Sequence, residues 1–144
     1  SSDLVSAMNN LHINGGPFTN QNFNIDTLLT VGDASSSLYL TVYGTSGAYS
    51  FSPLTFFTSY PAIGGYTWDG SNNDVYFKFN NATTQYYVYP GGSNTGWTYI
   101  TFSGNIGDHI TGSFTGTVDL VDSTNNITYP AVSIYGNFNV SRNQ

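Results

Sequence analysis

The feature that most constrains the fold is an alternation of apolar and polar residues with period two. In residues 109–120, HITGSFTGTVDL, one set of alternate positions is apolar with two glycines, and the other set is mostly threonine and serine. Successive side chains of a strand point to opposite faces of a sheet, so this segment predicts a strand with one buried and one hydroxyl-rich face. We expect Gly112 and Gly116 to let aromatic side chains from across the core lie close to the backbone.

The same alternation recurs along most of the chain. It is present in the segments SLYLTVYG, DVYFKFN, QYYVYP, WTYITF and VSIYGNFNVSR. Segments rich in Gly, Asn, Asp and Ser separate these runs, and such residues adopt turn conformations readily. Many short strands joined by such turns predict an all-β protein, an antiparallel β-sandwich of the jelly-roll or immunoglobulin-like type.

The N-terminal segment departs from this pattern. Its apolar residues Leu4, Met8 and Leu11 follow helical spacing, which predicts either a short helix on the sheet or an arm exchanged with another molecule. We therefore divide the chain into an N-terminal segment, residues 1–14, and a single β-sandwich domain, residues 15–144. The whole chain of 144 residues is long enough for one domain with a substantial core.

Charged residues are scarce. They make up 7% of the sequence, against roughly a quarter in an ordinary domain, and the net charge is −6 with Lys78 and Arg142 as the only basic residues besides histidine. Binding to nucleic acids or to anionic membranes needs several Lys or Arg contacts with phosphates, so both partners are disfavoured. No apolar run has the length of a membrane span. Without cysteine there is no disulfide and no Cys-ligated metal.

Three features favour an extracellular or cell-surface location. The sequence holds Asn-x-Ser/Thr sequons at Asn81, Asn126 and Asn139, which are candidate N-glycosylation sites. It begins at Ser1 rather than at a methionine, as a processed secreted protein does and as a fragment also does. The few Lys and Arg residues leave few cleavage sites for trypsin-like proteases, which suits a protein outside the cell.

Four segments together resemble a known kind of domain. INGGPFT, GYTWDGS and ITFSGNIGDHITGSFTGTVDL, followed by ITYPAVSIYGNFNVSR, are similar to the small secreted or lipoprotein-type β-sandwich domains of uncharacterised function in environmental bacteria. Those domains share an entry strand of the form ING-x-PF and a closing pair of strands, GxIxGxFxGT and Y-x-(I/V)-x-G-x-F-x-V-x-R. The resemblance is best in the C-terminal third. It implies an extracellular β-sandwich and brings no catalytic residues with it.

No pattern of catalytic residues stands out. The chain has no Gly-x-Ser-x-Gly motif and no Glu, and its only histidines are His12 and His109. We therefore predict neither an enzyme nor a cofactor. Asp69, Ser71 and Asn73 form a weak candidate for calcium binding, because their oxygens match the first, third and fifth positions of an EF-hand loop. The Gly and Glu that such a loop needs at its sixth and twelfth positions are missing, and a hairpin turn explains the same residues.

The composition favours self-assembly. Scattered Lys and Glu residues normally keep sheets of neighbouring molecules apart, whereas a surface of Tyr, Asn, Ser and Thr can form polar contacts between identical subunits. We predict an extracellular structural protein, a subunit of a filament, sheath or adhesive surface layer, with N-terminal strand addition as one route of assembly. The predicted contact residues are Leu4, Val5, Met8, Leu11, Thr111, Ser113, Thr115 and Thr117.

A non-catalytic carbohydrate-binding module is the alternative. Sugars stack on exposed aromatic rings, and aromatic residues at alternate positions of a strand share one face. Aromatic residues also favour strands and fill cores, so the same residues fit a purely structural role. The candidate sugar-binding residues are Tyr66, Trp68, Tyr87, Tyr89, Trp97 and Tyr99.

Overall fold

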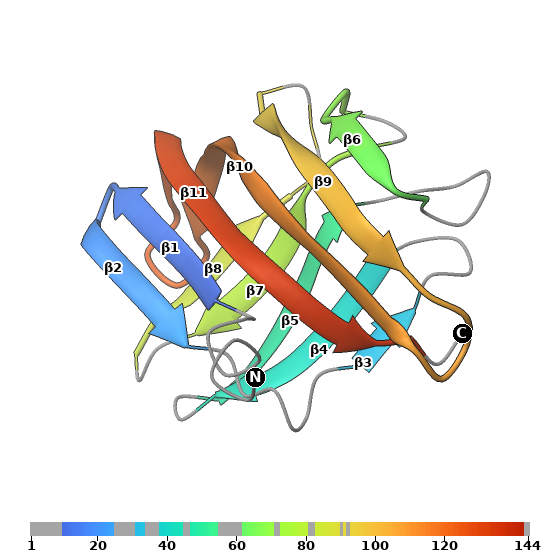
Figure 1. Ribbon diagram of the computed structural model, residues 1–144. Helices are drawn as coiled ribbons and strands as arrows, with labels where there is room; N and C mark the ends of the chain where they lie inside the picture. Colours follow the sequence, from blue (N-terminus) through green and yellow to red (C-terminus); the bar gives the residue numbers. More distant parts are fainter. Residues whose placement is uncertain are drawn as a thin grey trace.

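A computed structural model shows the fold of most of the chain. It describes residues 10–24, 31–33, 38–44, 47–54, 62–70, 73–80, 83–89, 91 and 93–142. Within these ranges the protein is all-β, and its strands form one antiparallel sheet (Figure 1). The all-β antiparallel prediction is thus confirmed. In the same ranges no helix is long and apolar enough to cross a membrane.

Eleven strands make up the sheet. They are β1 (Asn10–Gly15), β2 (Phe18–Asn24), β3 (Val31–Asp33), β4 (Leu38–Gly44), β5 (Gly47–Leu54), β6 (Gly64–Thr67), β7 (Tyr76–Asn80), β8 (Gln85–Val88), β9 (Thr95–Ser103), β10 (His109–Asp122) and β11 (Ile127–Ser141). The order of pairing is β2-β1-β11-β10-β8-β7-β5-β4-β3, and β9 pairs with β10 on one side and β6 on the other.

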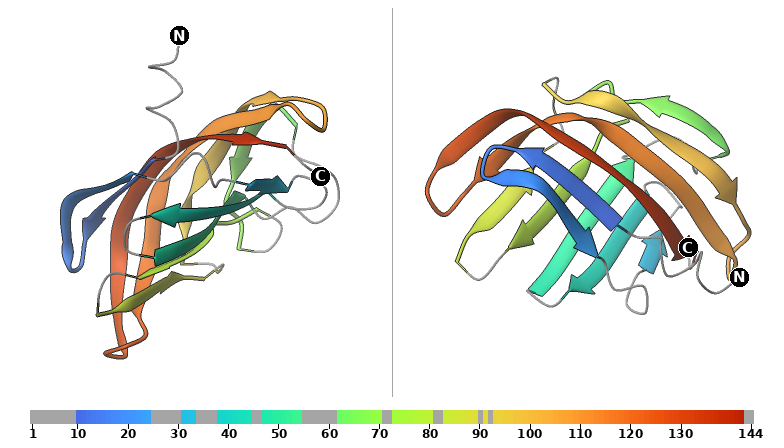
Figure 2. Two further views of the ribbon diagram at one scale, coloured as in Figure 1. Left: turned by 90° about the horizontal axis from the view of Figure 1, so that it is seen from below. Right: turned by 60° about the vertical axis from the view of Figure 1, so that its left-hand side comes forward.

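The sheet bends into two layers at β10. Residues 110–117 of this strand pair with β9, whereas residues 121–122 pair with β8. Figures 1 and 2 show β2, β1, β11, β10, β9 and β6 in one layer, and β8, β7, β5, β4 and β3 crossing behind it. The predicted sandwich would consist of two separate sheets, whereas here the hydrogen bonding continues around the bend.

A β-bulge in β11 lies at this bend. Val118 pairs with Val132 but Leu120 pairs with Tyr129, so β11 has one extra residue at this point. Ala131, within the bulge, adopts a left-handed conformation with a φ of 55°. A bulge bends its strand and increases the local twist, and this one falls between the two parts of β10 that pair with different layers.

The core lies between the two layers. Phe114 on β10, Phe138 on β11 and Phe77 on β7 are at most 2% exposed. The ring of Phe18 on β2 packs edge-on against Tyr86 on β8, with 5.1 Å between centroids, and so joins the layers. The apolar positions of β10 and β11 alternate with exposed or half-buried positions over most of their length, which confirms the predicted period-two pattern.

Glycines on β10 and β11 make room for aromatic rings. A Cβ atom at Gly112 would lie 2.5 Å from Phe138 Cζ, and one at Gly136 would lie 2.7 Å from Phe114 Cζ. Each glycine faces the other strand's aromatic residue directly in the β10–β11 ladder. Gly112 lies close to an aromatic ring, as predicted. The ring belongs to the neighbouring strand, however, and not to a residue across the core. Gly116 similarly lies under the Trp68 ring.

Residues 10–14 belong to the sheet. They pair with β11 on one side and, over most of their length, with β2 on the other, so the predicted domain boundary after residue 14 falls inside a strand and is wrong. Leu11 is 6% exposed and belongs to the core, which contradicts its prediction as a subunit contact. Leu4, Val5 and Met8 lie outside the described residues.

Candidate functional site

The most distinctive surface is the outer face of the layer containing β2, β1, β11, β10 and β9. We call outer face the side of this layer that points away from the core. Alternation along the strands and their register bring its residues together. These residues are Asn10, His12, Asn14, Asn20, Asn22, Thr95, Trp97, Tyr99, Thr101, Thr111, Ser113, Thr115, Thr117, Ser133, Tyr135, Asn137 and Asn139. None of them is Asp, Lys or Arg, but the next position of β10 on this face is Asp119, which is half-buried at the bend.

The side chains of the outer face form rows across the strands. His12 pairs with Asn22 on one side and with Tyr135 on the other. The row continues to Thr115 on β10 and Trp97 on β9. Because neighbouring strands are about 4.8 Å apart, this row places amide, imidazole, phenol, hydroxyl and indole groups side by side.

The predicted threonine and serine contacts all lie on the outer face. The hydroxyls of Thr117 and Thr95 are 2.7 Å apart, and those of Thr111 and Thr101 are 2.8 Å apart. Ser113 and Thr115 lie between these two pairs on β10. The structure thus places the four residues together on one polar strip, and their contact role stays a prediction.

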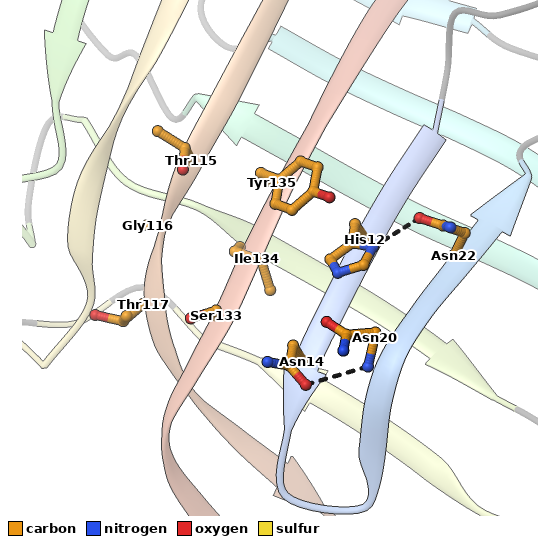
Figure 3. Close-up of a pocket in the computed structure, with 10 residues that line it drawn as sticks. All are labelled: His12, Asn14, Asn20, Asn22, Thr115, Gly116, Thr117, Ser133, Ile134 and Tyr135. Atoms are coloured by element: carbon orange, nitrogen blue, oxygen red, sulfur yellow. Dashed lines mark hydrogen bonds between the residues drawn. The ribbon is translucent and has the colours of Figure 1, made fainter.

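A groove crosses the outer face over β2, β1, β11 and β10. It is a wide, shallow hollow with a volume of about 660 Å³. Figure 3 shows the residues that line it. Its lining residues are His12, Asn14, Asn20, Asn22, Thr115, Gly116, Thr117, Ser133, Ile134 and Tyr135. Sequence reasoning named Thr115 and Thr117 among these but missed the groove, because it depends on strands that pair over more than a hundred residues of chain.

The side chains of the groove are held in place by one another. The His12 ring stacks on Tyr135 with 4.4 Å between centroids, and His12 Nδ1 is hydrogen-bonded to Asn22 Oδ1 at 2.7 Å. The backbone N–H of Asn20 donates to Asn14 Oδ1 at 3.1 Å. Asn20 has a φ of 45°, a conformation that asparagine tolerates better than most residues. The groove is therefore built before any ligand arrives.

Exposed apolar side chains gather beside the outer face, along β6, β9 and the turn after β9. Eight large apolar side chains are exposed by 42% or more in the described part of the chain, and five of them lie here. We call these five the apolar margin: Ile63, Trp97, Tyr99, Phe102 and Ile106. Because β6 pairs only with residues 97–100 of β9, residues 101–103 of β9 extend beyond its end.

Trp68 contradicts its prediction as a sugar-binding residue. It is 4% exposed, and its Nε1–H donates to the hydroxyl of Thr98 at 2.9 Å inside the core. Tyr66 is half-buried and packs against the core. Its hydroxyl donates to the carbonyl of Ala62 at 2.7 Å.

The remaining candidate aromatics fall on two different layers. Trp97 and Tyr99 lie on the outer face, whereas Tyr87 and Tyr89 lie on or next to β8 in the other layer. The rings of Tyr87 and Tyr89 stack in parallel at 5.3 Å. Lys78 Nζ lies over the Tyr87 ring at 5.6 Å, and the Tyr76 ring contacts Tyr89 at 6.4 Å. Each ring of this pair therefore covers one face of the other, and Tyr89 remains 52% exposed.

The calcium candidate is used as a turn. The backbone N–H of Asp69 donates to the carbonyl of Asn73 at 2.7 Å, and the Asn73 N–H donates to Asp69 Oδ1 at 3.0 Å. Ser71 lies outside the described residues. Groups of three or more His, Cys, Asp or Glu suited to a metal ion are absent from the described ranges.

The three sequons differ in their settings. Asn126 is exposed in the turn between β10 and β11 and has a φ of 58°. Asn139 is half-buried, and its Oδ1 is hydrogen-bonded to His109 Nδ1 at 2.9 Å. Asn81 lies outside the described residues. Of the two described sequons, Asn126 is the more accessible to a glycosylating enzyme.

Comparisons of the chain with protein-family models, with curated proteins and with solved structures find no match. The resemblance to secreted bacterial β-sandwich domains stays a prediction. Function must therefore be inferred from the chemistry of the outer face, its groove and the apolar margin.

Proposed function

We propose that this protein is a non-catalytic, extracellular structural protein, a subunit of a filament, sheath or adhesive surface layer. Its copies associate through the apolar margin and the adjoining strip of the outer face. The observation that carries this proposal is the absence of Asp, Lys and Arg from residues 95–101 of β9 and 111–117 of β10, beside the exposed aromatic and aliphatic side chains of the apolar margin.

The chemistry of the outer face suits contact with a second copy. Hydroxyls and carboxamides both donate and accept hydrogen bonds, so two identical surfaces of Thr, Ser and Asn can satisfy each other. A surface of carboxylates could not, because carboxylates only accept. Burying residues 95–101 and 111–117 also removes no Asp, Lys or Arg from water, which would be unfavourable.

The apolar margin provides the residues that gain most from association. Trp97 and Tyr99 are 44% and 45% exposed, and Phe102 beside them is 43% exposed. Aromatic side chains of this kind are enriched at protein interfaces and carry a large share of their binding energy.

Trp97→Lys tests this proposal. We expect the unmodified protein to form regular assemblies, seen by negative-stain electron microscopy and by light scattering at rising concentration. Lysine at position 97 puts a charge into the contact and removes its largest ring, so the variant should remain monomeric. The matched control is Tyr89→Lys, an equally exposed aromatic residue next to β8 in the other layer, which should assemble normally.

Two results would refute the proposal. One is unmodified protein that stays monomeric at the highest concentration reached. The other is an equal loss of assembly in Trp97→Lys and Tyr89→Lys, because it would place the contact elsewhere or show a general effect of added charge.

A further inference from the structure

The groove on the outer face has the donor and acceptor set of a site for sugars. Its polar lining consists of amides, hydroxyls, a phenol and an imidazole, and each of these can donate as well as accept hydrogen bonds. In the described part of the chain, the Nδ2 groups of Asn14 and Asn22 donate to no protein acceptor. Both groups are exposed and available to a ligand that brings its own hydroxyls.

The groove also has an aromatic surface that is fixed in position. Tyr135 is 51% exposed, and its ring is supported by His12, which Asn22 in turn holds through its hydrogen bond. Figure 3 shows Tyr135 and His12 side by side over β11 and β1, with Asn14 and Ser133 near them. The C–H face of a pyranose ring stacks on such a ring while its hydroxyls bond to the neighbouring amides.

Size and openness favour a chain of sugars. The volume of about 660 Å³ lies within the roughly 300–1,000 Å³ of ordinary ligand sites. The groove is shallow and broadly open to solvent, so a linear oligosaccharide can lie across the strands without its ends being enclosed.

The charge distribution excludes acidic ligands. Lys78 lies in the other layer, over Tyr87, and Arg142 donates to the carbonyl of Gly104 at the end of β11. Neither residue lines the groove, and the chain carries a net charge of −6. A uronic acid, sulfate or phosphate group would find no Lys or Arg at this site.

We infer that the groove binds a neutral oligosaccharide, with Tyr135 stacking against one sugar ring and Asn14, Asn22 and Ser133 bonding its hydroxyls. The residues that bind the sugar lie on β1, β2 and β11, outside the apolar margin, although Thr115 and Thr117 of the adjoining strip also line the groove. We expect the monomeric protein to bind sugar through Tyr135, Asn14, Asn22 and Ser133.

Isothermal titration calorimetry with defined hexasaccharides tests this site. The neutral probes are hexamers of β-linked glucose, xylose, mannose and N-acetylglucosamine, and the acidic probe is hexagalacturonate. We expect saturable binding of at least one neutral hexamer and none of hexagalacturonate. Tyr135→Ala should weaken binding about tenfold, because it removes the stacking surface. The matched control is Tyr99→Ala on the same face outside the groove, which should bind like the unmodified protein.

Three results would overturn the inference. They are a lack of binding by every neutral hexamer, unchanged binding by Tyr135→Ala, and an equal loss in Tyr99→Ala. The Trp97→Lys variant separates this inference from the assembly proposal, because it should lose assembly and keep sugar binding. Loss of sugar binding in that monomeric variant would show that the site depends on assembly, which contradicts an independent groove.

Discussion

A contact made by one residue can decide which face of a strand is buried. The WTYITF segment shows why the buried face cannot be predicted from alternation alone. In it Trp97 and Tyr99 are exposed while Thr98 between them is fully buried. The reason lies elsewhere in the chain, because the Thr98 hydroxyl accepts the indole N–H of the buried Trp68. Alternation predicts that neighbours face opposite ways but not which of them faces the core.

The Gly136→Ala substitution tests the packing of glycine against aromatic rings. A Cβ atom here would lie 2.7 Å from Phe114 Cζ and would also clash with the carbonyl of Asn10. Overpacking of this kind destabilises by about 1–3 kcal/mol. We expect thermal unfolding to show a lower Tm by several degrees.

The matched control for this substitution is Gly91→Ala. Within the described part of the chain, a Cβ atom at Gly91 meets no other atom within 4 Å. The Tm of Gly91→Ala should stay near that of the unmodified protein. If Gly136→Ala has the same Tm as Gly91→Ala, the Phe114 ring moves aside without lowering the stability of the fold.

At the level of elements, strands are predictable and their partners are not. The period-two pattern identifies β10 and β11, and the turn residues between them indicate a hairpin. The pairing of β1 with β11 joins residues 10–14 to residues 133–137, and nothing local in the chain specifies it. Pro130 is a local signal of the bulge, because proline lacks the backbone N–H that a ladder of hydrogen bonds needs. No residue near Pro130 indicates which strands the two parts of β10 pair with.

The turn between β10 and β11 makes fold stability depend on pH. Hydrogen bonds from the Asn125 side chain, and from the backbone N–H groups of Asn125 and Thr124, lower the pKa of the Asp122 carboxyl, although burial acts to raise it. A pKa lowered by folding stabilises the protein above the unfolded value near 3.9, and this contribution is lost as the pH falls through the folded value.

Asp122→Asn removes this contribution. We expect its Tm to lie below that of the unmodified protein at pH 7, and the gap to narrow as the pH falls below about 4, measured by circular dichroism melts. Asp119→Asn is the control, because it removes the same charge from β10 outside the turn. A gap that stays constant from pH 7 to pH 2 would show that the Asp122 charge does not stabilise the turn.

At the scale of the whole molecule, the effect of the scarce charge depends on where the fold places the uncharged residues. The composition predicts a protein without electrostatic protection against association, but it cannot say where the uncharged residues gather. The fold brings them together on one outer face, places the exposed aromatics at its β6–β9 side and forms the groove at its β1–β2 side. The six predicted sugar-binding residues do not form one surface, because they are divided between the core and two layers.

The two tryptophans allow assembly to be followed without any label. Trp68 is 4% exposed and Trp97 is 44% exposed, so only Trp97 should be quenched strongly by acrylamide in dilute solution. If copies meet through the apolar margin, quenching of Trp97 should fall as concentration rises, because association removes the ring from water. The Trp97→Phe variant reports Trp68 alone and should be quenched weakly at every concentration. Trp97 fluorescence that stays fully quenchable in assembled protein would place the contact on another surface and leave the apolar margin in water.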